Sequence, residues 1–143
     1  MVYTVSKFDV WTGELVDRVG GLRSKLASLA AVGVDLAFVV ARRQLEKPKT
    51  GVVFLGGIKG AKAIRAAAAA GLTKSNQLTA LRVEEINKPG SCFKLTSLLA
   101  DAGIGLRGLS ASVFGKKCVY IVAFDSPTDA DRAIQVLRAA RRS

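Results

Sequence analysis

Two turns of this chain combine residue types that could hold an anion or a small polar ligand. Residues 87–91 read NKPGS, and residues 17–21 read DRVGG. Proline fixes one backbone angle, and glycine lets the main chain come close to whatever lies above it. Each turn opens a segment of helical periodicity, and the free amides at a helix N-terminus attract carboxylates and other anions. The same residues would also serve as a plain strand-to-helix turn, so both interpretations stay open.

Catalysis and metal binding have little support in the residue types present. The sequence contains no histidine, which removes the usual general base at neutral pH and the commonest metal ligand. A hydrolase built on a serine or cysteine with a histidine partner is therefore excluded. Cys92 and Cys118 lie far apart among apolar neighbours, so we interpret them as buried thiols in a reducing compartment. We predict a protein that is not an enzyme and has no catalytic residue, no metal and no cofactor.

The composition predicts a folded, cytoplasmic protein. Half of the 143 residues are apolar, which is enough for a real core. No apolar run is long enough to span a membrane, and the first residues lack the pattern of a signal peptide.

The formal net charge of +11 raises the alternative of a basic nucleic-acid-binding protein of the same fold. The basic residues are scattered, however, with a dense cluster only at residues 138–142. RNA-recognition domains stack bases on aromatic side chains of a central strand. The corresponding positions in the apolar segment 118–124 are Val119 and Ile121, which are aliphatic, so base recognition on the sheet is disfavoured.

The chain matches itself when it is shifted by 70 residues without a gap. Identical pairs fall at glycines between elements and at core positions, for example Gly20 with Gly90 and Phe54 with Phe124. Because the matches coincide with the expected ends of helices and strands, we interpret them as a duplication. We expect a first unit of residues 1–72 and a second unit of residues 73–143.

Each copy has the periodicity of a strand, a helix, two strands and a second helix. The first strand ends near residue 16 or 86, and an amphipathic helix follows it. The further elements expected are strands 34–43 and 51–55, helix 58–70 and strand 72–80 in the first copy, then strands 104–114 and 118–124 and helix 128–141 in the second. This order predicts an α/β fold of the α+β sandwich type, with two ferredoxin-like βαββαβ units. Each unit would have an antiparallel sheet with its helices on one face.

Two features predict contacts beyond a simple pair of units. The second copy leaves no room for a closing strand, and residues 1–8 correspond to residues 71–78 under the shift. We therefore hypothesise that residues 1–8 close the second unit. In addition, segments 51–55 and 118–124 are apolar on both faces, and such strands are normally covered on both. We expect a homodimer that forms through sheet faces or edges.

The string VEEINKPGSCFKLTSLLADAGIGLRGLS, residues 83–110, resembles the first half of an ACT domain. The family pattern is a strand, an acidic or amide residue, a basic residue, Pro-Gly, a helix, and then Gly-hydrophobic-polar-hydrophobic at the next strand. Residues 17–36 match it more loosely, so the resemblance covers nearly the whole chain. It implies a ferredoxin-like fold that binds an amino acid or similar effector where two such domains meet. Most ACT-like modules are attached to enzymes, and this chain has no such partner domain, so we expect a freestanding regulatory protein that acts on another protein.

The resemblance also implies a ligand site. In family members that bind an amino acid, the residue before the basic-Pro-Gly step holds the ligand, which here is Asn87 or, in the first copy, Asp17. The polar residue that opens the next strand is a second contact, for which the first copy offers Asp35 and the second only Gly105. Where some members carry a histidine, the second copy has Glu85, so the two copies are unequal. The residues expected to bind the ligand are Asp17, Gly20, Gly21, Val34, Asp35, Asn87, Gly90, Ser91 and Ile104.

Overall fold

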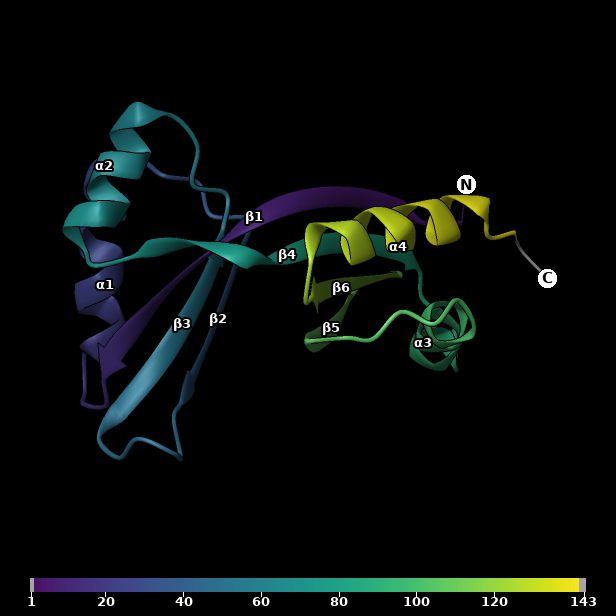
Figure 1. Ribbon diagram of the computed structural model, residues 1–143, viewed down its shortest axis with the longest axis horizontal. Helices are drawn as coiled ribbons and strands as arrows, with labels where there is room; N and C mark the ends of the chain where they lie inside the picture. The colour runs from purple at the N-terminus through teal and green to yellow at the C-terminus, as the bar shows by residue number, and fades with distance from the viewer. Residues whose placement is uncertain (1, 142–143) are drawn as a thin grey trace. The chain divides into compact units, whose positions relative to one another are not determined.

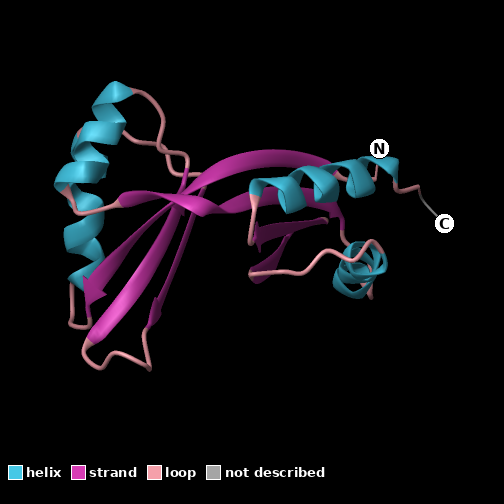
Figure 2. Cartoon of the chain, in the orientation of Figure 1, coloured by secondary structure: helices cyan, strands magenta, loops and turns pink. Residues whose placement is uncertain are grey.

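The computed structural model describes residues 2–141 and contains ten helices and strands in that range (Figure 1, Figure 2). In chain order they are β1 (Thr4–Val16), α1 (Gly21–Ala31), β2 (Phe38–Arg43), β3 (Thr50–Gly56), α2 (Ala61–Ala69), β4 (Thr73–Ile86), α3 (Ser91–Asp101), β5 (Gly108–Phe114), β6 (Lys117–Phe124) and α4 (Pro127–Ala139). No helix among the described residues is long and apolar enough to cross a membrane.

The chain folds into two compact units that share the long strands β1 and β4. One unit is residues 9–76, and the other combines residues 2–8 with residues 77–141. The strand order is β2-β3-β1-β4-β6-β5, and β1 with β3, β2 with β3, β4 with β6 and β5 with β6 pair antiparallel. The predicted fold class, with ferredoxin-like units and antiparallel pairing, is therefore confirmed. The boundary between the two sequence copies at residues 72 and 73 stays a prediction.

In the unit of residues 9–76, α1 and α2 lie side by side on one face of the strands (Figure 1). Along β3 every second residue from Gly51 to Leu55 is buried, as a half-buried sheet requires. Ala63 and Ala67 lie one helical turn apart on the buried side of α2, and their small size lets the helix approach the sheet closely. The core of this unit is formed by Trp11, Leu15, Leu29, Val53, Leu55, Ile58, Ala63, Ala67 and Leu72.

In the unit of residues 2–8 and 77–141, α3 and α4 pack with β4 and β6 around a second core. Along β6 every second residue from Cys118 to Phe124 is buried, while Val119 and Ile121 on the other face are half-buried. α4 begins where the Ser126 hydroxyl accepts a hydrogen bond from the Asp129 N–H at 3.1 Å, a side-chain cap of the ordinary kind. The core comprises Tyr3, Leu81, Val83, Leu95, Leu99, Ile104, Cys118, Tyr120, Val122, Phe124, Ala130, Ala133 and Leu137.

The strands after α1 and α3 begin about four residues later than the sequence predicts. β2 begins at residue 38 rather than 34, and β5 at residue 108 rather than 104. The reason is that the N–H of Val34 donates to the Leu29 carbonyl at 3.1 Å, and the N–H of Ile104 donates to the Leu99 carbonyl at 3.0 Å. These bonds close the C-terminal turn of each helix after a glycine of positive φ, so both residues belong to helix ends.

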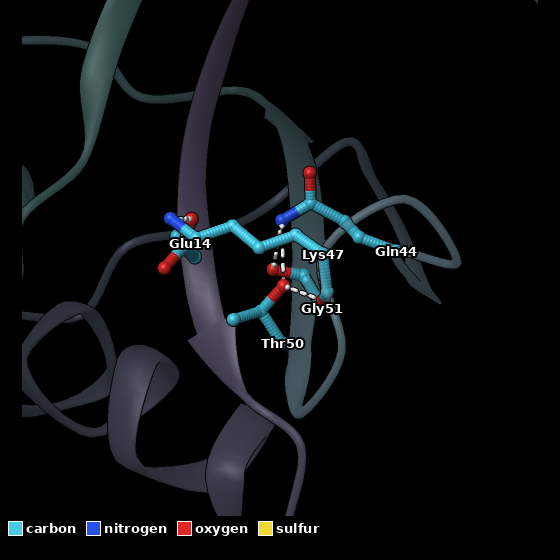
Figure 3. Close-up of polar contacts among 5 residues, drawn as sticks. All are labelled: Glu14, Gln44, Lys47, Thr50 and Gly51. Carbon is cyan, nitrogen blue, oxygen red and sulfur yellow. Dashed lines mark hydrogen bonds and ion pairs between the residues drawn. The ribbon is translucent and has the colours of Figure 1, made fainter.

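The hairpin between β2 and β3 is held by polar side chains (Figure 3). The Thr50 hydroxyl donates to the Lys47 carbonyl at 2.7 Å, and the Gln44 amide donates to the Thr50 hydroxyl and the Gly51 carbonyl, both at 3.2 Å. The Lys47 ammonium lies 2.9 Å from the Glu14 carboxylate on β1. These contacts fix the hairpin beside the end of β1, next to the first of the two candidate turns.

Candidate functional site

The turn before α3 is shaped by Gly90 and Ser91. Gly90 has a φ of 83°, a left-handed conformation that favours glycine. The buried Ser91 hydroxyl accepts a hydrogen bond from the Lys88 N–H at 3.0 Å, and the Ser91 N–H donates to the Lys88 carbonyl at 3.0 Å. The N–H groups of Cys92 and Phe93 then lie in the first helical turn, where no carbonyl of the helix itself can accept from them. The turn therefore presents donors that could bind an anion.

A cavity of about 120 Å³ opens beside this turn. It lies within one compact unit, and the ionisable residues that line it are Glu85, Lys88 and Lys94. Two of the predicted site residues, Gly90 and Ser91, line it, and Asn87 lies in the same turn. The lining residues are Val2, Glu85, Ile86, Lys88, Pro89, Gly90, Ser91 and Lys94.

Glu85 is oriented by a buried tyrosine. The Tyr120 hydroxyl donates to the Glu85 carboxylate at 2.6 Å, a short bond of the charge-assisted kind. Glu85 has the same parity along β4 as the fully buried Leu81 and Val83, so its side chain emerges on the core face. One carboxylate oxygen is thus held by the core while the residue also lines the cavity.

A second tyrosine is buried in the same core. Tyr3 is fully buried, and its hydroxyl lacks a hydrogen-bond partner among the described residues. Burial, together with the negative charge of Glu85, raises the pKa of Tyr3 to about 12. Burial also raises the pKa of Tyr120, and its hydrogen bonds to Cys118 and Glu85 act in the same direction. Both phenols are therefore neutral at physiological pH, and Tyr120 serves as a donor to Glu85.

The corresponding turn of the first copy is built differently. Gly20 has a φ of 82°, like Gly90, but a Cβ at Gly21 would collide with the Val16 carbonyl oxygen. Glycine at position 21 is thus required by packing. The Asp17 carboxylate lies 3.0 Å from the Arg43 guanidinium of β2. Its charge is therefore already paired within the unit.

The other predicted contacts lie far from these turns. Val34 and Asp35 follow the C-terminus of α1, whereas Gly20 precedes its N-terminus, and an 11-residue helix is about 16 Å long. Ile104 follows the C-terminus of α3 and is 4 % exposed in the core. Asp35 is exposed, and Val34 packs against the core of residues 9–76. A single unit therefore does not bring the turn residues together with the residues that follow each helix.

The sequence-based list of site residues omits Glu85, Lys88, Lys94 and Val2, which line the cavity, and Tyr120, which donates to Glu85. The sequence does contain one signal for Tyr120. Glu85 has the same parity along β4 as core residues, and a carboxylate on the core face needs a hydrogen-bond donor. Tyr120 lies on the matching face of β6. Lys94 and Val2 carry no such signal, since only the folded chain brings them to the turn.

The described residues hold no group of three or more His, Cys, Asp or Glu side chains that could bind a metal ion.

No protein-family model matches the sequence, and no curated protein matches it. Solved structures do share the fold. A protein from Bacteroides thetaiotaomicron is 18% identical with a TM-score of 0.69, and the match covers 96% of this chain and 90% of that one. The ligand-free regulatory subunit of aspartate kinase from Thermus thermophilus is 10% identical with a TM-score of 0.68, covering 98% and 97%.

The aspartokinase III of E. coli, solved in complex with aspartate and ADP, is 11% identical with a TM-score of 0.59. That match covers 96% of this chain and 32% of the kinase. At these identities the likeness is one of fold. The shared fold is a tandem of two ferredoxin-like units, the architecture that the resemblance to ACT domains implies.

Proposed function

We propose that this chain is a non-catalytic regulatory protein that binds a small amino acid in the cavity beside residues 87–91. The observation that carries the proposal is the lining of that cavity, in which Glu85, Lys88 and Lys94 lie beside the N-terminus of α3. A cavity with charges of both signs is complementary to a zwitterion.

Each charged end of an amino acid would meet a group of opposite charge in the cavity. The ammonium of an amino acid would meet the Glu85 carboxylate, which Tyr120 orients. The carboxylate would meet Lys88 or Lys94 and the first amides of α3, where the helix dipole adds to the attraction. Asn87 would add an uncharged donor and acceptor at the rim.

The size of the cavity supports a small ligand. Its volume is about 120 Å³. Sites for drug-sized ligands occupy about 300–1,000 Å³. We therefore expect an amino acid with a short side chain, or the α-carbon end of a longer one whose side chain projects outward.

The comparisons support a regulatory role in general terms. The fold is shared with regulatory subunits of aspartate kinase, and one neighbour is a kinase solved with aspartate. By analogy of fold, such a pair of units would transmit ligand binding to the protein that it regulates.

Titration calorimetry with each of the twenty amino acids tests the proposal. We expect heat of binding from a small amino acid, and a loss of at least tenfold in affinity for Glu85→Gln. The substitution removes the charge but keeps an oxygen that can accept from Tyr120, so the core should stay intact. Glu46→Gln, at an exposed position of the β2–β3 hairpin, is the matched control and should bind as the unaltered chain does. If no amino acid gives heat, or if both variants weaken binding equally, the proposal is wrong.

A further inference from the structure

Three aliphatic side chains are largely exposed at one end of the unit of residues 9–76. Val16, the last residue of β1, is 59 % exposed, Val19 in the turn after it is fully exposed, and Leu45 in the loop between β2 and β3 is 89 % exposed. The turn and the loop lie at the same end of this unit (Figure 1). Single apolar residues on a surface are ordinary, but three at one end of a small unit indicate a surface that contacts a partner.

The two segments that carry these side chains are tied to each other. The Asp17 N–H donates to the Lys49 carbonyl at 3.0 Å, and the Arg43 guanidinium lies 3.0 Å from the Asp17 carboxylate. The side chains of Gln44 and Thr50 hold the rest of the loop (Figure 3). Because the loop is held in place before any partner arrives, binding would not have to order it.

Basic side chains surround the exposed aliphatic ones. We call residues 16–19 together with residues 42–49 the basic tip, since five of these residues are basic and two are acidic. Arg43 and Lys47 form ion pairs within the unit. Among the described residues, Arg18, Arg42 and Lys49 are exposed and form no ion pair. Their charges are therefore available to a partner.

The second copy of the duplicated fold has no equivalent of the basic tip. Six residues connect β2 to β3, whereas two connect β5 to β6. Under the 70-residue shift, Leu45 corresponds to Gly115 and Lys49 corresponds to Val119. The longer loop, its leucine and its free lysine are therefore not requirements of the fold.

We propose that the basic tip docks an acidic segment of another protein, in which carboxylates are interspersed with aliphatic side chains. The carboxylates would meet Arg18, Arg42 and Lys49, and the aliphatic side chains would pack on Leu45 and Val19. The net charge of +11 would draw such a segment in from a distance. The basic tip and the amino-acid cavity belong to different compact units, so this proposal does not depend on the one above.

The same residues disfavour nucleic acid and anionic lipid as the partner. The basic tip has no aromatic side chain, whereas single-stranded nucleic acid stacks on such side chains and membrane interfaces favour Trp and Tyr. The carboxylates of Asp17 and Glu46 lie among the cations, and a uniformly negative surface would repel them. A protein segment can place its charges to avoid them.

Fluorescence anisotropy with labelled synthetic peptides tests the proposal. One peptide consists of repeated Asp-Glu-Leu units, and a second has serine in place of each leucine. We expect the leucine peptide to bind at physiological ionic strength, and the serine peptide to bind more weakly because it lacks the apolar contacts.

Two double variants with the same change in charge locate the binding surface. Arg18→Glu/Lys49→Glu reverses two charges of the basic tip and should weaken binding of the leucine peptide by roughly tenfold or more. Lys62→Glu/Arg65→Glu makes the same change at exposed positions of α2 and should keep the affinity within about twofold, since long-range attraction alone is screened by salt. Thermal unfolding checks that both variants are folded.

The variant Leu45→Ser tests the apolar contact without disturbing the core, because Leu45 is largely exposed. It should weaken binding of the leucine peptide and leave binding of the serine peptide unchanged. Failure of the leucine peptide to bind, equal weakening by both charge variants, no effect of Leu45→Ser, or stronger binding of single-stranded DNA or phosphatidylserine vesicles would overturn the proposal.

Discussion

Two tyrosine-to-phenylalanine substitutions in one core should change stability in opposite directions. Tyr120→Phe removes the hydroxyl that donates to Glu85 at 2.6 Å. Tyr3→Phe removes a fully buried hydroxyl that has no partner among the described residues. Both variants keep the aromatic ring, so packing is preserved and the polar contribution is isolated.

The magnitudes follow from the hydrogen bonding. A hydrogen bond to a charged group contributes about 1.5–3 kcal/mol. Since Glu85 also lines the cavity, water can solvate it after the change, and we expect Tyr120→Phe to cost about 1.5–2 kcal/mol. A buried polar group without a partner costs about 1–3 kcal/mol, so Tyr3→Phe should stabilise the chain by about 1 kcal/mol. The two variants should then differ by roughly 3 kcal/mol.

Urea unfolding followed by far-ultraviolet circular dichroism measures both values. The denaturation midpoint should fall for Tyr120→Phe and rise for Tyr3→Phe, with an unchanged slope. The double variant Tyr120→Phe/Glu85→Gln separates the hydrogen bond from any change in packing, because it removes the charge that Tyr120 serves. If Tyr3→Phe destabilises the chain as much as Tyr120→Phe, the two hydroxyls have equivalent surroundings and the reasoning is refuted.

Three further predictions concern pH, backbone and salt. The pKa of Tyr3 is raised from 10.0 to about 12, so the unfolded chain ionises first and the folded chain loses stability as the pH rises from 10 through 12. Unfolding at alkaline pH should show this loss, and Tyr3→Phe should reduce it. Gly21→Ala should cost well over 2 kcal/mol because its Cβ meets the Val16 carbonyl, whereas Gly90→Ala, with open space around it, should cost about 1–2 kcal/mol for its left-handed backbone; thermal unfolding compares them. Any nucleic-acid binding should disappear at physiological salt in a mobility-shift assay, since it would rest on charge alone.

Much of the fold can be predicted because its signals are local. The alternation of apolar residues along β6 and the glycines at helix ends act within a few residues of where they stand, and the 70-residue shift transfers each signal to the other copy. The start of β2 is different. Whether Val34 continues a strand or closes a helix depends on a hydrogen bond to Leu29, and both outcomes suit the same residue type.

The site can be predicted only in part for the same reason. Gly90 and Ser91 belong to a turn that the sequence marks directly. The cavity beside them also needs Val2, which lies more than eighty residues away in the chain. The ion pair between Asp17 and Arg43 is equally non-local, since nothing in the turn itself indicates that the Asp17 carboxylate is already paired.

One pair of positions accounts for much of the difference between the two copies. In the first copy, Arg43 on the edge strand and Asp17 in the turn form an ion pair. That pair neutralises the carboxylate of the turn and at the same time leaves charged residues along the edge. In the second copy the same positions are Val113 and Asn87, so the turn keeps an uncharged polar side chain and the edge becomes apolar.

A surface ion pair of this kind stabilises a protein by only about 0–1 kcal/mol. Its loss from one copy therefore costs little stability, and it leaves an uncharged polar side chain, Asn87, at the turn of the second copy. This is why the ligand proposal concerns the unit that contains residues 77–141.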